Sequence, residues 1–306
     1  MDVVTCTLCG NEQSKLVCEG YDRDIPTNTQ TYHFMQCTRC KLVWLTPRAT
    51  TPDELAAIYP PSYDSYIKQD QTFLMLLRRI AWQDELREII NLTSSSSHIL
   101  EIGSATGEFL HELQRKGRKQ LLGIDLSEHA AKVARERYGI DVRSGELDDL
   151  NLTAQNFDLV IMRHVLEHVS NPLKTLRYIT SILKPNGYCI FTIPNIDSHT
   201  MRIFGKDWYG YQFPRHFHLF PNSTLALLLK LSGLDLKATV YITTPNIWIG
   251  SSRFALERRK FTRLAKFMRY QNPLAIALFA PLGIYSAAIR SSGVIRIVAQ
   301  RAKHTI

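Results

Sequence analysis

The amino-acid sequence predicts an α/β fold with a doubly wound sheet, preceded by a small module that holds paired cysteines. Short apolar segments alternate with helical segments across residues 98–306, and two C-x-x-C pairs lie within the first 45 residues. Such alternation is typical of a parallel sheet with helices on both faces. With 306 residues, 45% of them hydrophobic, the chain is long enough to bury a core of this kind.

The predicted strands of the sheet are seven short runs rich in aliphatic residues. They cover residues 98–102, 120–125, 141–144, 157–163, 187–193, 234–243 and 293–301. The helices between them cover residues 108–116, 127–138, 172–183 and 222–231. Ser127 stands at a helix N-cap position, and Gly117, Gly139 and Gly233 stand where helices should end. Ligands of such sheets bind beyond the carboxyl ends of the strands, so functional residues are expected there.

Composition divides the chain into three parts. Residues 1–45 form the cysteine module. Residues 46–97 are predicted to form a linker and a helical lid, with a helix that begins at Pro52, a cluster of tyrosines (Tyr59, Tyr63, Tyr66) and then an amphipathic helix. Residues 98–306 form the sheet domain, which includes a basic and apolar helical insertion at about 246–290 before the last strand.

The first strand of the sheet runs into a glycine-rich loop, E-I-G-S-A-T-G at 101–107. A nicotinamide or flavin dinucleotide would require glycines at 103, 105 and 108, but the chain has Ala105 and Glu108. Glu108 would also repel a pyrophosphate at the helix N-terminus. S-adenosylmethionine carries no phosphate, and its cationic groups tolerate a carboxylate such as Glu101. The loop therefore favours S-adenosylmethionine, with Asp125 at the end of the next strand placed for the ribose hydroxyls.

These motifs resemble the class I S-adenosylmethionine-dependent methyltransferases. The matching segments are E-x-G-x-x-x-G at 101–107, G-I-D at 123–125, G-E-L at 145–147, F-D-L-V at 157–160 and H-V-L-E-H at 164–168. The match is closest to members with a zinc ribbon that act in glycan, polysaccharide and small-molecule biosynthesis, and it covers nearly the whole chain. It implies a Rossmann-like sheet.

The resemblance also implies a set of cofactor-binding residues. They are Glu101, Gly103, Ala105, Gly107, Asp125, Leu126, Glu146, Leu147, Arg163 and Tyr63. Two of them depart from the family pattern. Ala105 stands where the loop often has a glycine, and Glu146 stands where an aspartate commonly contacts the adenine amino group.

The two C-x-x-C pairs predict a metal site. Its candidate ligands are Cys6, Cys9, Cys37 and Cys40. Four thiolates suit tetrahedral Zn²⁺ and leave no open position for a substrate, so the predicted zinc is structural. Two disulfides, a metal-free segment, or His33 in place of one ligand are the alternatives. Cys18 and Cys189 are expected to be core residues. The module is expected to orient the tyrosine segment over the cofactor or to shape the acceptor pocket.

Histidines are the candidate general bases, because methylation of a hydroxyl requires removal of its proton. His164 and His168 follow the fourth strand of the sheet, and His216 lies in an aromatic-rich loop after the fifth. His168 has packing or hydrogen bonding as its alternative role. Candidate acceptor contacts in the same loop are Trp208, Tyr209, Tyr211, Arg215 and His218. Arg215 suits an acidic acceptor or a nucleotide diphosphate, whereas the aromatic residues fill a lid in the alternative.

The net charge of +9 is concentrated at the C-terminus. Residues 251–306 contain eleven Lys or Arg and one acidic residue, whereas residues 1–250 are nearly neutral. The basic stretch at 253–269 predicts one helix, and an uncharged stretch with two prolines follows at 270–289. We do not expect it to span a membrane. A basic amphipathic helix beside an apolar segment suits an anionic membrane surface through residues 251–290. The alternative is an insertion packed on the sheet.

The sequence therefore predicts a methyltransferase that acts on a hydroxyl of a glycan or small-molecule acceptor, with structural zinc. The first ten residues contain no secretory signal, so we expect a cytoplasmic protein with possible peripheral attachment at the inner membrane face. A noncatalytic zinc-ribbon scaffold is one alternative, and an RNA methyltransferase that uses the basic C-terminus is another. Arg163-His164 stands where base-methylating enzymes often have an N/D-P-P-Y/F/W loop, so nucleic acid is not the expected partner. Nothing in the sequence specifies an oligomeric state.

Overall fold

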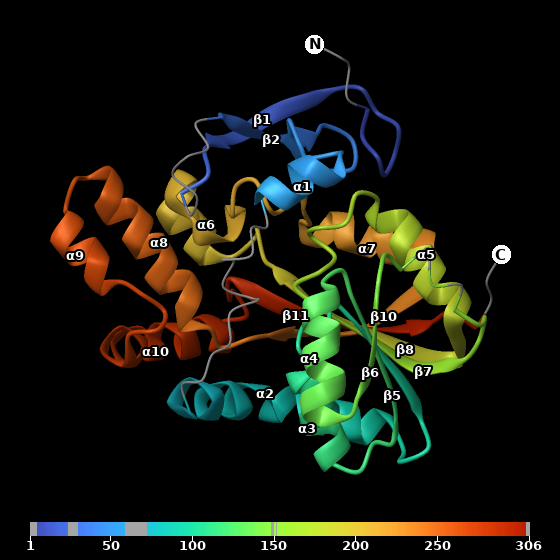
Figure 1. The fold of residues 1–306 in the computed structure, drawn as a ribbon. Coiled ribbons are helices and arrows are strands. Elements are labelled where there is room, and N and C mark those ends of the chain that lie inside the picture. Colours follow the sequence, from blue (N-terminus) through green and yellow to red (C-terminus); the bar gives the residue numbers. More distant parts are fainter. Residues whose placement is uncertain (1–4, 24–29, 59–71, 148–149, 151, 304–306) are drawn as a thin grey trace.

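The computed structural model describes residues 5–23, 30–58, 72–147, 150 and 152–303, and a seven-stranded sheet lies at its centre (Figure 1). The strand order is β10-β11-β8-β7-β4-β5-β6. The strands are β4 (His98–Ile102), β5 (Gln120–Asp125), β6 (Asp141–Ser144), β7 (Phe157–Arg163), β8 (Leu183–Pro194), β10 (Leu234–Tyr241) and β11 (Val294–Arg301). The α/β prediction is confirmed, and each of the seven predicted strands is present with small differences at its ends.

The sheet is mixed rather than wholly parallel. Strands β6, β5, β4, β7 and β8 are parallel, whereas β11 is antiparallel to both β8 and β10. The helical insertion leaves the sheet at the carboxyl end of β10 and returns to the same edge, where Val294 pairs with Pro194 and Tyr241 pairs with Ile295. The chain can therefore re-enter only in the opposite direction.

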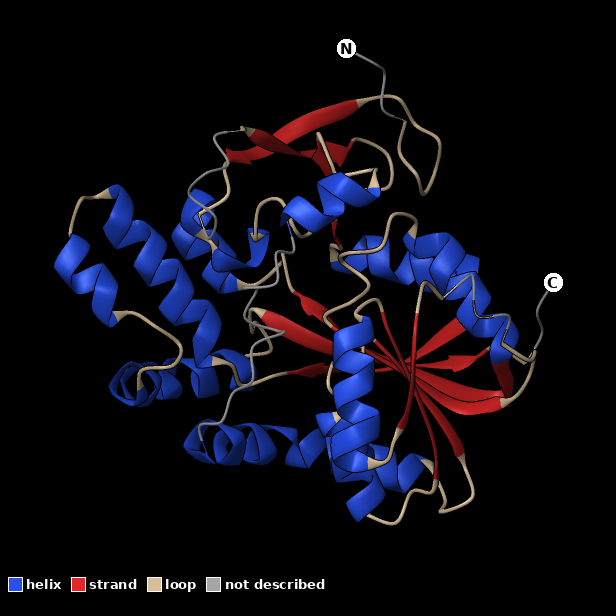
Figure 2. Ribbon diagram, viewed as in Figure 1, coloured by secondary structure: helices blue, strands red, loops and turns tan. Residues whose placement is uncertain are grey.

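Helices cover both faces of this sheet (Figure 2). One layer contains α2 (Thr72–Leu92), α3 (Glu108–Arg115) and α4 (Glu128–Tyr138), and the other contains α5 (Pro172–Ile182) and α7 (Asn222–Ser232). Alternate strand residues face the two layers: Ile99 packs in the first core cluster and Leu100 in the second. Strands buried on both faces explain the continuous aliphatic runs in the sequence.

Helix α2 belongs to this body by its packing. Leu86 and Ile89 are buried in the same cluster as Ile99 of β4, and the Trp82 ring lies edge-on to Phe109 at 5.4 Å. The boundary predicted at residue 97 therefore divides a helix from the sheet it covers. The tyrosine cluster of the predicted lid lies outside the described residues.

A second, four-stranded sheet lies at the N-terminal side (Figure 1). Its strands are β1 (Ser14–Gly20), β2 (Tyr32–Cys37), β3 (Val43–Thr46) and β9 (His218–Leu219), in that order, and α1 (Pro52–Ile58) follows β3. Strand β9 comes from the segment after β8, and pairs Leu219 with Val43 and His218 with Trp44. The segment that follows β8 of the large sheet thus supplies the last strand of the small one.

The insertion contains α8 (Pro245–Arg258), α9 (Thr262–Phe267) and α10 (Pro273–Ala288). The prediction of one basic helix across 253–269 was wrong. Lys260 adopts a left-handed backbone (φ 64°), and the Phe261 N–H donates to the carbonyl of Leu256, which is a helix-ending arrangement. In the described part of the chain, no helix has both the length and the apolar character needed to cross a membrane.

Candidate functional site

The glycine-rich loop after β4 can form only with glycine at its two tightest positions. Gly103 and Gly107 have φ of 71° and 74°. A Cβ on Gly103 would lie 2.4 Å from Cγ2 of Val165, and a Cβ on Gly107 would lie 2.9 Å from Cβ of Ala134. The chain therefore turns closely past Val165, which follows β7, and past α4, and it opens α3 at the carboxyl edge of the sheet.

Asp125, at the end of β5, holds that loop in place. Its carboxylate accepts hydrogen bonds from the Ala105 N–H at 2.7 Å and from the Ser127 N–H at 2.9 Å. Burial raises the pKa of Asp125, and the two N–H donors oppose that effect. Ala105 takes a left-handed backbone (φ 45°), a conformation that favours glycine, which is the residue often found at this position in the family. Leu126 follows and is 70% exposed, in a position to cover a flat ring.

Glu101 is fully buried at the end of β4 and is paired with Arg163 at the end of β7. The Arg163 Nε donates to Glu101 Oε1 at 3.1 Å, and the guanidinium lies over the ring of Phe109 at 3.9 Å. The other oxygen, Oε2, is buried without a partner among the described residues. Burial raises the pKa of Glu101 to about 7, although Arg163 favours the charged form. An unsatisfied acceptor beside a glycine loop fits the ammonium of S-adenosylmethionine.

The remaining predicted cofactor residues are distributed unevenly. Leu147 is half-buried against the main core, whereas Glu146 is exposed at the edge beyond β6. Tyr63 lies outside the described residues. The carboxyl ends of β4, β5 and β7 thus bring together Glu101, the loop, Asp125 and Arg163, and these residues fit S-adenosylmethionine as the ligand.

His164 lies beyond β7 and forms a pair with Glu167. Its Nδ1 is 3.0 Å from Glu167 Oε1, so Nδ1–H donates to the carboxylate and Nε2 is the basic nitrogen. His164 has a left-handed backbone (φ 56°), and its side chain is 49% exposed while that of Glu167 is fully buried. Burial alone would raise the pKa of Glu167, but the hydrogen bond from His164 and the neighbouring imidazoles lower it to about 2.

His168 and His216 surround the same carboxylate from the other side. His168 Nδ1 donates to the Arg215 carbonyl at 2.9 Å, and His216 Nδ1 donates to the Gly210 carbonyl at 2.8 Å. Burial lowers the pKa of both imidazoles, that of His216 to about 3. A neutral imidazole with so low a pKa is a weak base, and His216 is also buried, so its surroundings do not favour the expected role as a general base, which stays a prediction.

The aromatic loop between β8 and β9 was expected to contact the acceptor, but most of it is core. Trp208, Tyr211 and His218 are at most 3% exposed, and Tyr211 packs on Phe34 of β2. Tyr209 is half-buried near Phe254. These positions match the lid-filling alternative: the loop joins the small sheet to the large one.

The expectation that Arg215 binds an acidic acceptor is likewise not supported. Its guanidinium makes a two-point ion pair with Asp22, at 3.2 and 3.1 Å, and both side chains are 1% exposed. Asp22 and Glu167 were not selected from the sequence. For Glu167 a signal existed, since it lies three residues after His164. For Asp22, separated from Arg215 by 193 residues, there was none.

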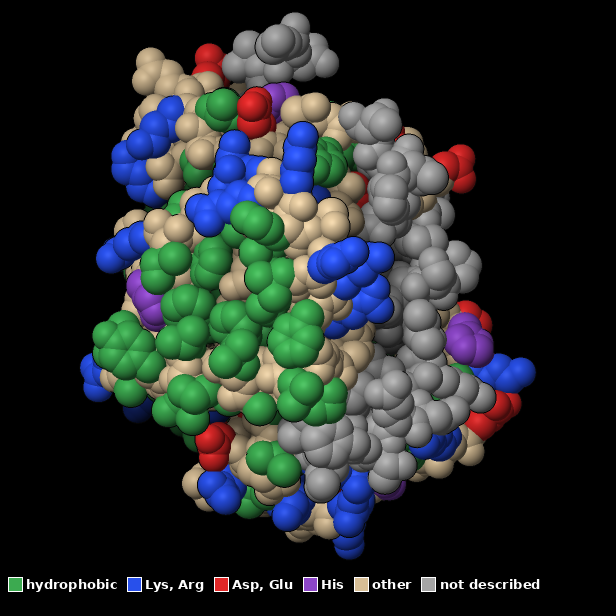
Figure 3. All heavy atoms as spheres, turned by 90° about the vertical axis from the view of Figure 1, so that its left-hand side faces the viewer, with side chains coloured by type: hydrophobic (Ala, Val, Ile, Leu, Met, Phe, Trp, Pro, Cys, Tyr) green, Lys and Arg blue, Asp and Glu red, His purple; other side chains and the backbone are tan. Residues whose placement is uncertain are grey.

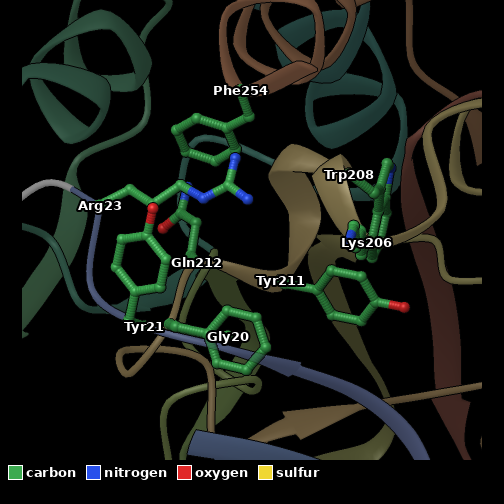
Figure 4. A pocket seen from close by; sticks show the side chains of 9 residues that line it. Gly20, Tyr21, Arg23, Lys206, Trp208, Tyr211, Gln212 and Phe254 are labelled. Atoms are coloured by element: carbon green, nitrogen blue, oxygen red, sulfur yellow. The ribbon is translucent and has the colours of Figure 1, made fainter. Parts of the chain in front are cut away.

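A small pocket lies where the small sheet, the aromatic loop and α8 meet (Figure 4). The Arg23 guanidinium lies over the Phe254 ring at 4.5 Å and over Tyr21 at 5.7 Å. Arg23 also pairs with Asp207 at 3.1 Å, and Arg258 of α8 pairs with the same carboxylate at 2.7 Å. These contacts join the three elements, so we assign the pocket to packing at their junction.

The four paired cysteines converge at the N-terminal edge of the small sheet. Sγ of Cys6 is 3.4 Å from Sγ of Cys40, and Sγ of Cys9 is 3.6 Å from Sγ of Cys37. All four sulfur atoms lie within 4.8 Å of one another, and all four cysteines are free thiols. Cys18 and Cys189 are buried elsewhere, as expected of core residues.

Comparison with known proteins identifies relatives over the large sheet. Residues 76–239, more than half of the chain, match the model of a family described as "Methyltransferase domain". A ubiquinone biosynthesis O-methyltransferase from Cereibacter sphaeroides is 30% identical over 169 residues, covering 51% of this chain and 68% of that protein. The enzyme of the same name from Stutzerimonas stutzeri is 27% identical over 180 residues, covering 54% of this chain and 74% of that protein.

Solved structures show the same fold at low identity. Phosphoethanolamine N-methyltransferase 2 from Haemonchus contortus, in complex with S-adenosyl-L-methionine, has a TM-score of 0.52 at 17% identity, covering 85% of this chain and 62% of that one. A chain of the complex between the Haloferax volcanii Trm112 methyltransferase activator and the putative methyltransferase has a TM-score of 0.53 at 16% identity, covering 74% of this chain and 92% of that one.

Proposed function

The chain belongs to the class I S-adenosylmethionine-dependent methyltransferases, and we propose that it methylates a hydroxyl of a carbohydrate or another small biosynthetic intermediate. The observation that carries this proposal is the His164–Glu167 pair at the carboxyl end of β7. Strand β7 is the direct neighbour of β4, which leads into the glycine loop. This position supports His164 as a base next to the predicted donor site, as a hydroxyl acceptor requires.

In the proposed reaction, His164 acts through Nε2. Glu167 accepts the Nδ1–H of His164, which fixes the ring and stabilises the imidazolium that forms. The acceptor oxygen forms its bond to the methyl carbon as the carbon–sulfur bond breaks, and the electron pair stays on sulfur in S-adenosylhomocysteine. The hydroxyl proton passes to His164. Orientation of donor and acceptor supplies much of the rate increase in such a displacement.

Oxygen as the methylated atom also draws support from the relatives, whose names state O-methyltransferase activity. The RNA methyltransferase alternative gains nothing from the basic C-terminus. Its cations border an apolar surface instead of forming a polar groove, and nucleic-acid interfaces are polar and strongly basic. The scaffold alternative differs in one measurable respect, because it requires no affinity for the methyl donor.

Donor binding is the first test of the proposed function. Asp125→Ala removes the acceptor for the Ala105 and Ser127 N–H groups, so we expect its dissociation constant for S-adenosylmethionine to rise at least about tenfold, the effect of losing ~1.4 kcal/mol. Calorimetry with S-adenosylmethionine and S-adenosylhomocysteine measures this. Asp141→Ala is the matched control, because Asp141 is exposed at the amino end of β6. Folded wild-type protein without donor affinity would favour the scaffold.

We also propose that Cys6, Cys9, Cys37 and Cys40 bind one structural Zn²⁺ as a zinc ribbon. Tetrahedral zinc with Zn–S bonds of about 2.3 Å places its sulfur ligands about 3.8 Å apart. Two of the sulfur–sulfur separations, 3.4 and 3.6 Å, are close to that value. The Cys40 N–H also points to Cys37 Sγ at 3.4 Å, which favours the thiolate.

For the insertion, we propose docking to an anionic membrane surface. Helix α10 is apolar on all sides: Ala275 and Gly283 are buried, while the opposite face exposes large side chains. The exposed apolar residues of α9, α10 and their flanks are Phe261, Leu264, Phe267, Leu274, Leu278, Leu282, Ile284, Tyr285 and Ile289. Figure 3 shows hydrophobic side chains gathered on this side of the molecule, with Lys and Arg along the border.

The charge around this apolar face selects the partner. Exposed cations beside it are Arg259, Lys260, Arg263, Lys266, Arg269 and Arg290. An apolar face bordered by cations inserts at the headgroup level while the cations meet anionic lipids, each worth about 1 kcal/mol near the surface. A lipid-linked glycan intermediate is then the acceptor best suited to the enzyme.

Cosedimentation with phosphatidylglycerol-containing vesicles tests the docking. Wild-type protein is expected to pellet with these vesicles, and less so at high salt. In a Leu274→Glu/Leu278→Glu variant we expect at least about a tenfold loss of binding. Both leucines are exposed in the free protein, and burying each of them in the bilayer is worth about 1.5–3 kcal/mol. Leu236→Glu is the control, since Leu236 is 50% exposed on β10, outside the face. Wild-type protein that stays in the supernatant would refute the docking.

A further inference from the structure

Glu167, His168 and His216 form a cluster of possible metal ligands. The proposed proton transfer uses His164 and Glu167 and does not account for His168 and His216. One ligand-capable atom from each of the three lies within 4.8 Å of the others, and the His168 and His216 rings meet edge-on with centroids 4.8 Å apart. Glu167 and His216 are 0% and 3% exposed. Two imidazoles and a carboxylate that converge on one point are a common ligand set for a divalent transition metal.

The hydrogen bonds of the two histidines match those of metal ligands. A ligating histidine usually donates its other ring N–H to a backbone carbonyl or a carboxylate, which fixes the ring and directs the second nitrogen at the metal. His168 and His216 both donate Nδ1–H to a carbonyl, those of Arg215 and Gly210. Ligation therefore falls to Nε2 in both, and Nε2 of His216 is 4.0 Å from Glu167 Oε1.

The carboxylate provides the second, independent observation. Glu167 Oε1 accepts from His164, but Oε2 is fully buried and has no hydrogen-bond partner among the described residues. A buried, unsatisfied carboxylate oxygen costs free energy unless a cation or donor satisfies it. Ligands bound at about 2.1 Å in adjacent positions are separated by about 3 Å, so a cation here needs only a modest inward movement of the rings.

We propose that Glu167, His168 and His216 bind a divalent transition-metal cation. It is distinct from the proposed cysteine site, because its three ligands leave coordination positions open. The binding itself does not depend on the reaction. Its role does rest on the proposed function: an acceptor hydroxyl bound at an open position would have a lowered pKa and would lose its proton to His164 more readily.

Cobalt titration of zinc-loaded protein tests the site in the absence of methyl donor and acceptor. We expect one equivalent of Co²⁺ to bind with visible d–d bands and without a sulfur-to-cobalt charge-transfer band, since the ligands are nitrogen and oxygen. His216→Gln, which keeps a polar side chain of similar length but removes one of the three proposed ligands, should weaken Co²⁺ binding at least about tenfold, the effect of losing ~1.4 kcal/mol. His218→Gln is the matched control, because His218 is equally buried and donates its Nδ1–H to the Val169 carbonyl at 3.1 Å but lies outside the cluster.

Two outcomes would overturn the proposal. One is that zinc-loaded wild-type protein binds no Co²⁺ in addition to its zinc, and the other is that wild type and folded His216→Gln bind Co²⁺ with equal affinity. A Glu167→Gln variant gives a second measurement if His216→Gln fails to fold, with the same expected loss. These outcomes are separable from failure of the proposed function. Donor binding and methyl transfer are measured in other assays, and a methyltransferase without this cation would still bind S-adenosylmethionine at Asp125.

Discussion

Replacing His164 with alanine is expected to lower turnover about 10²–10⁴-fold, the usual contribution of a general base. Donor affinity should change little, because the printed hydrogen bond of the His164 side chain goes to Glu167, whereas the residues placed for the donor lie in the loop after β4 and at the ends of β4, β5 and β7. Calorimetry for S-adenosylmethionine and steady-state turnover with an identified acceptor provide the two readouts. A fall in turnover without a fall in donor affinity distinguishes a base from a residue that merely supports the fold.

The choice of His164 over the other two histidines is physical. It alone of the three combines an exposed ring with a hydrogen bond from Nδ1 to a carboxylate. His33→Ala is a suitable control, since His33 also lies beside a glutamate, with Nε2 3.9 Å from Glu19 Oε2, but on β2. Near-normal turnover in His164→Ala would exclude it as the base, and reduced turnover in His33→Ala as well would point to a general loss of stability.

Removal of the proposed zinc is expected to have the second large effect. In Cys37→Ser we expect the loss of about one zinc per chain, early melting of the small sheet and a fall in turnover. Zinc binding to small folds contributes free energy on the order of 10–16 kcal/mol, so its loss should strongly destabilise the cysteine hairpins. Metal content, thermal melting and turnover are measured on the same sample.

The effect on turnover follows from hydrogen bonds that lead from the hairpins to the base. The Leu45 N–H donates to the Phe217 carbonyl, and the N–H groups of Phe217 and His218 both donate to the Glu167 carbonyl. Cys18→Ala is the control: Cys18 is a buried thiol of β1 outside the cysteine cluster, and the variant should keep its zinc. Verified zinc-free protein with unchanged melting and turnover would refute the structural role.

The large sheet was predictable because its signals are local. Each strand is a short aliphatic run beside a turn, and Ser127 does cap α4, accepting from the Ala130 N–H. Gly139 and Gly233 end their helices in the left-handed conformation, as their positions predicted. Asp125 was selected from its place after a strand, and it lies at the carboxyl edge of the sheet against the glycine loop. The spacing of apolar residues and the residues that begin or end helices predict such features without knowledge of distant contacts.

The site beyond the sheet was less predictable because burial is a tertiary property. The sequence around His164, His168 and His216 does not show which of the three imidazoles is buried. In the fold, His164 is exposed and His216 is buried. Arg215 was predicted to bind an anionic acceptor because its ion pair with Asp22 of the N-terminal module cannot be seen in the sequence. The break at Lys260 depends on one backbone conformation within a run that otherwise has helical spacing.

The two-residue strand β9 has a consequence for how the chain can be divided and how it is made. The first 46 residues contribute three strands of their sheet, but the fourth is synthesised more than 170 residues later, at His218–Leu219. Until then β3 has an open edge, and a strand edge without a partner is a site for unwanted pairing. Closing so long a loop is also slow. The N-terminal module is therefore completed late, by the same segment that places His216, and neither unit is structurally complete when cut from the other.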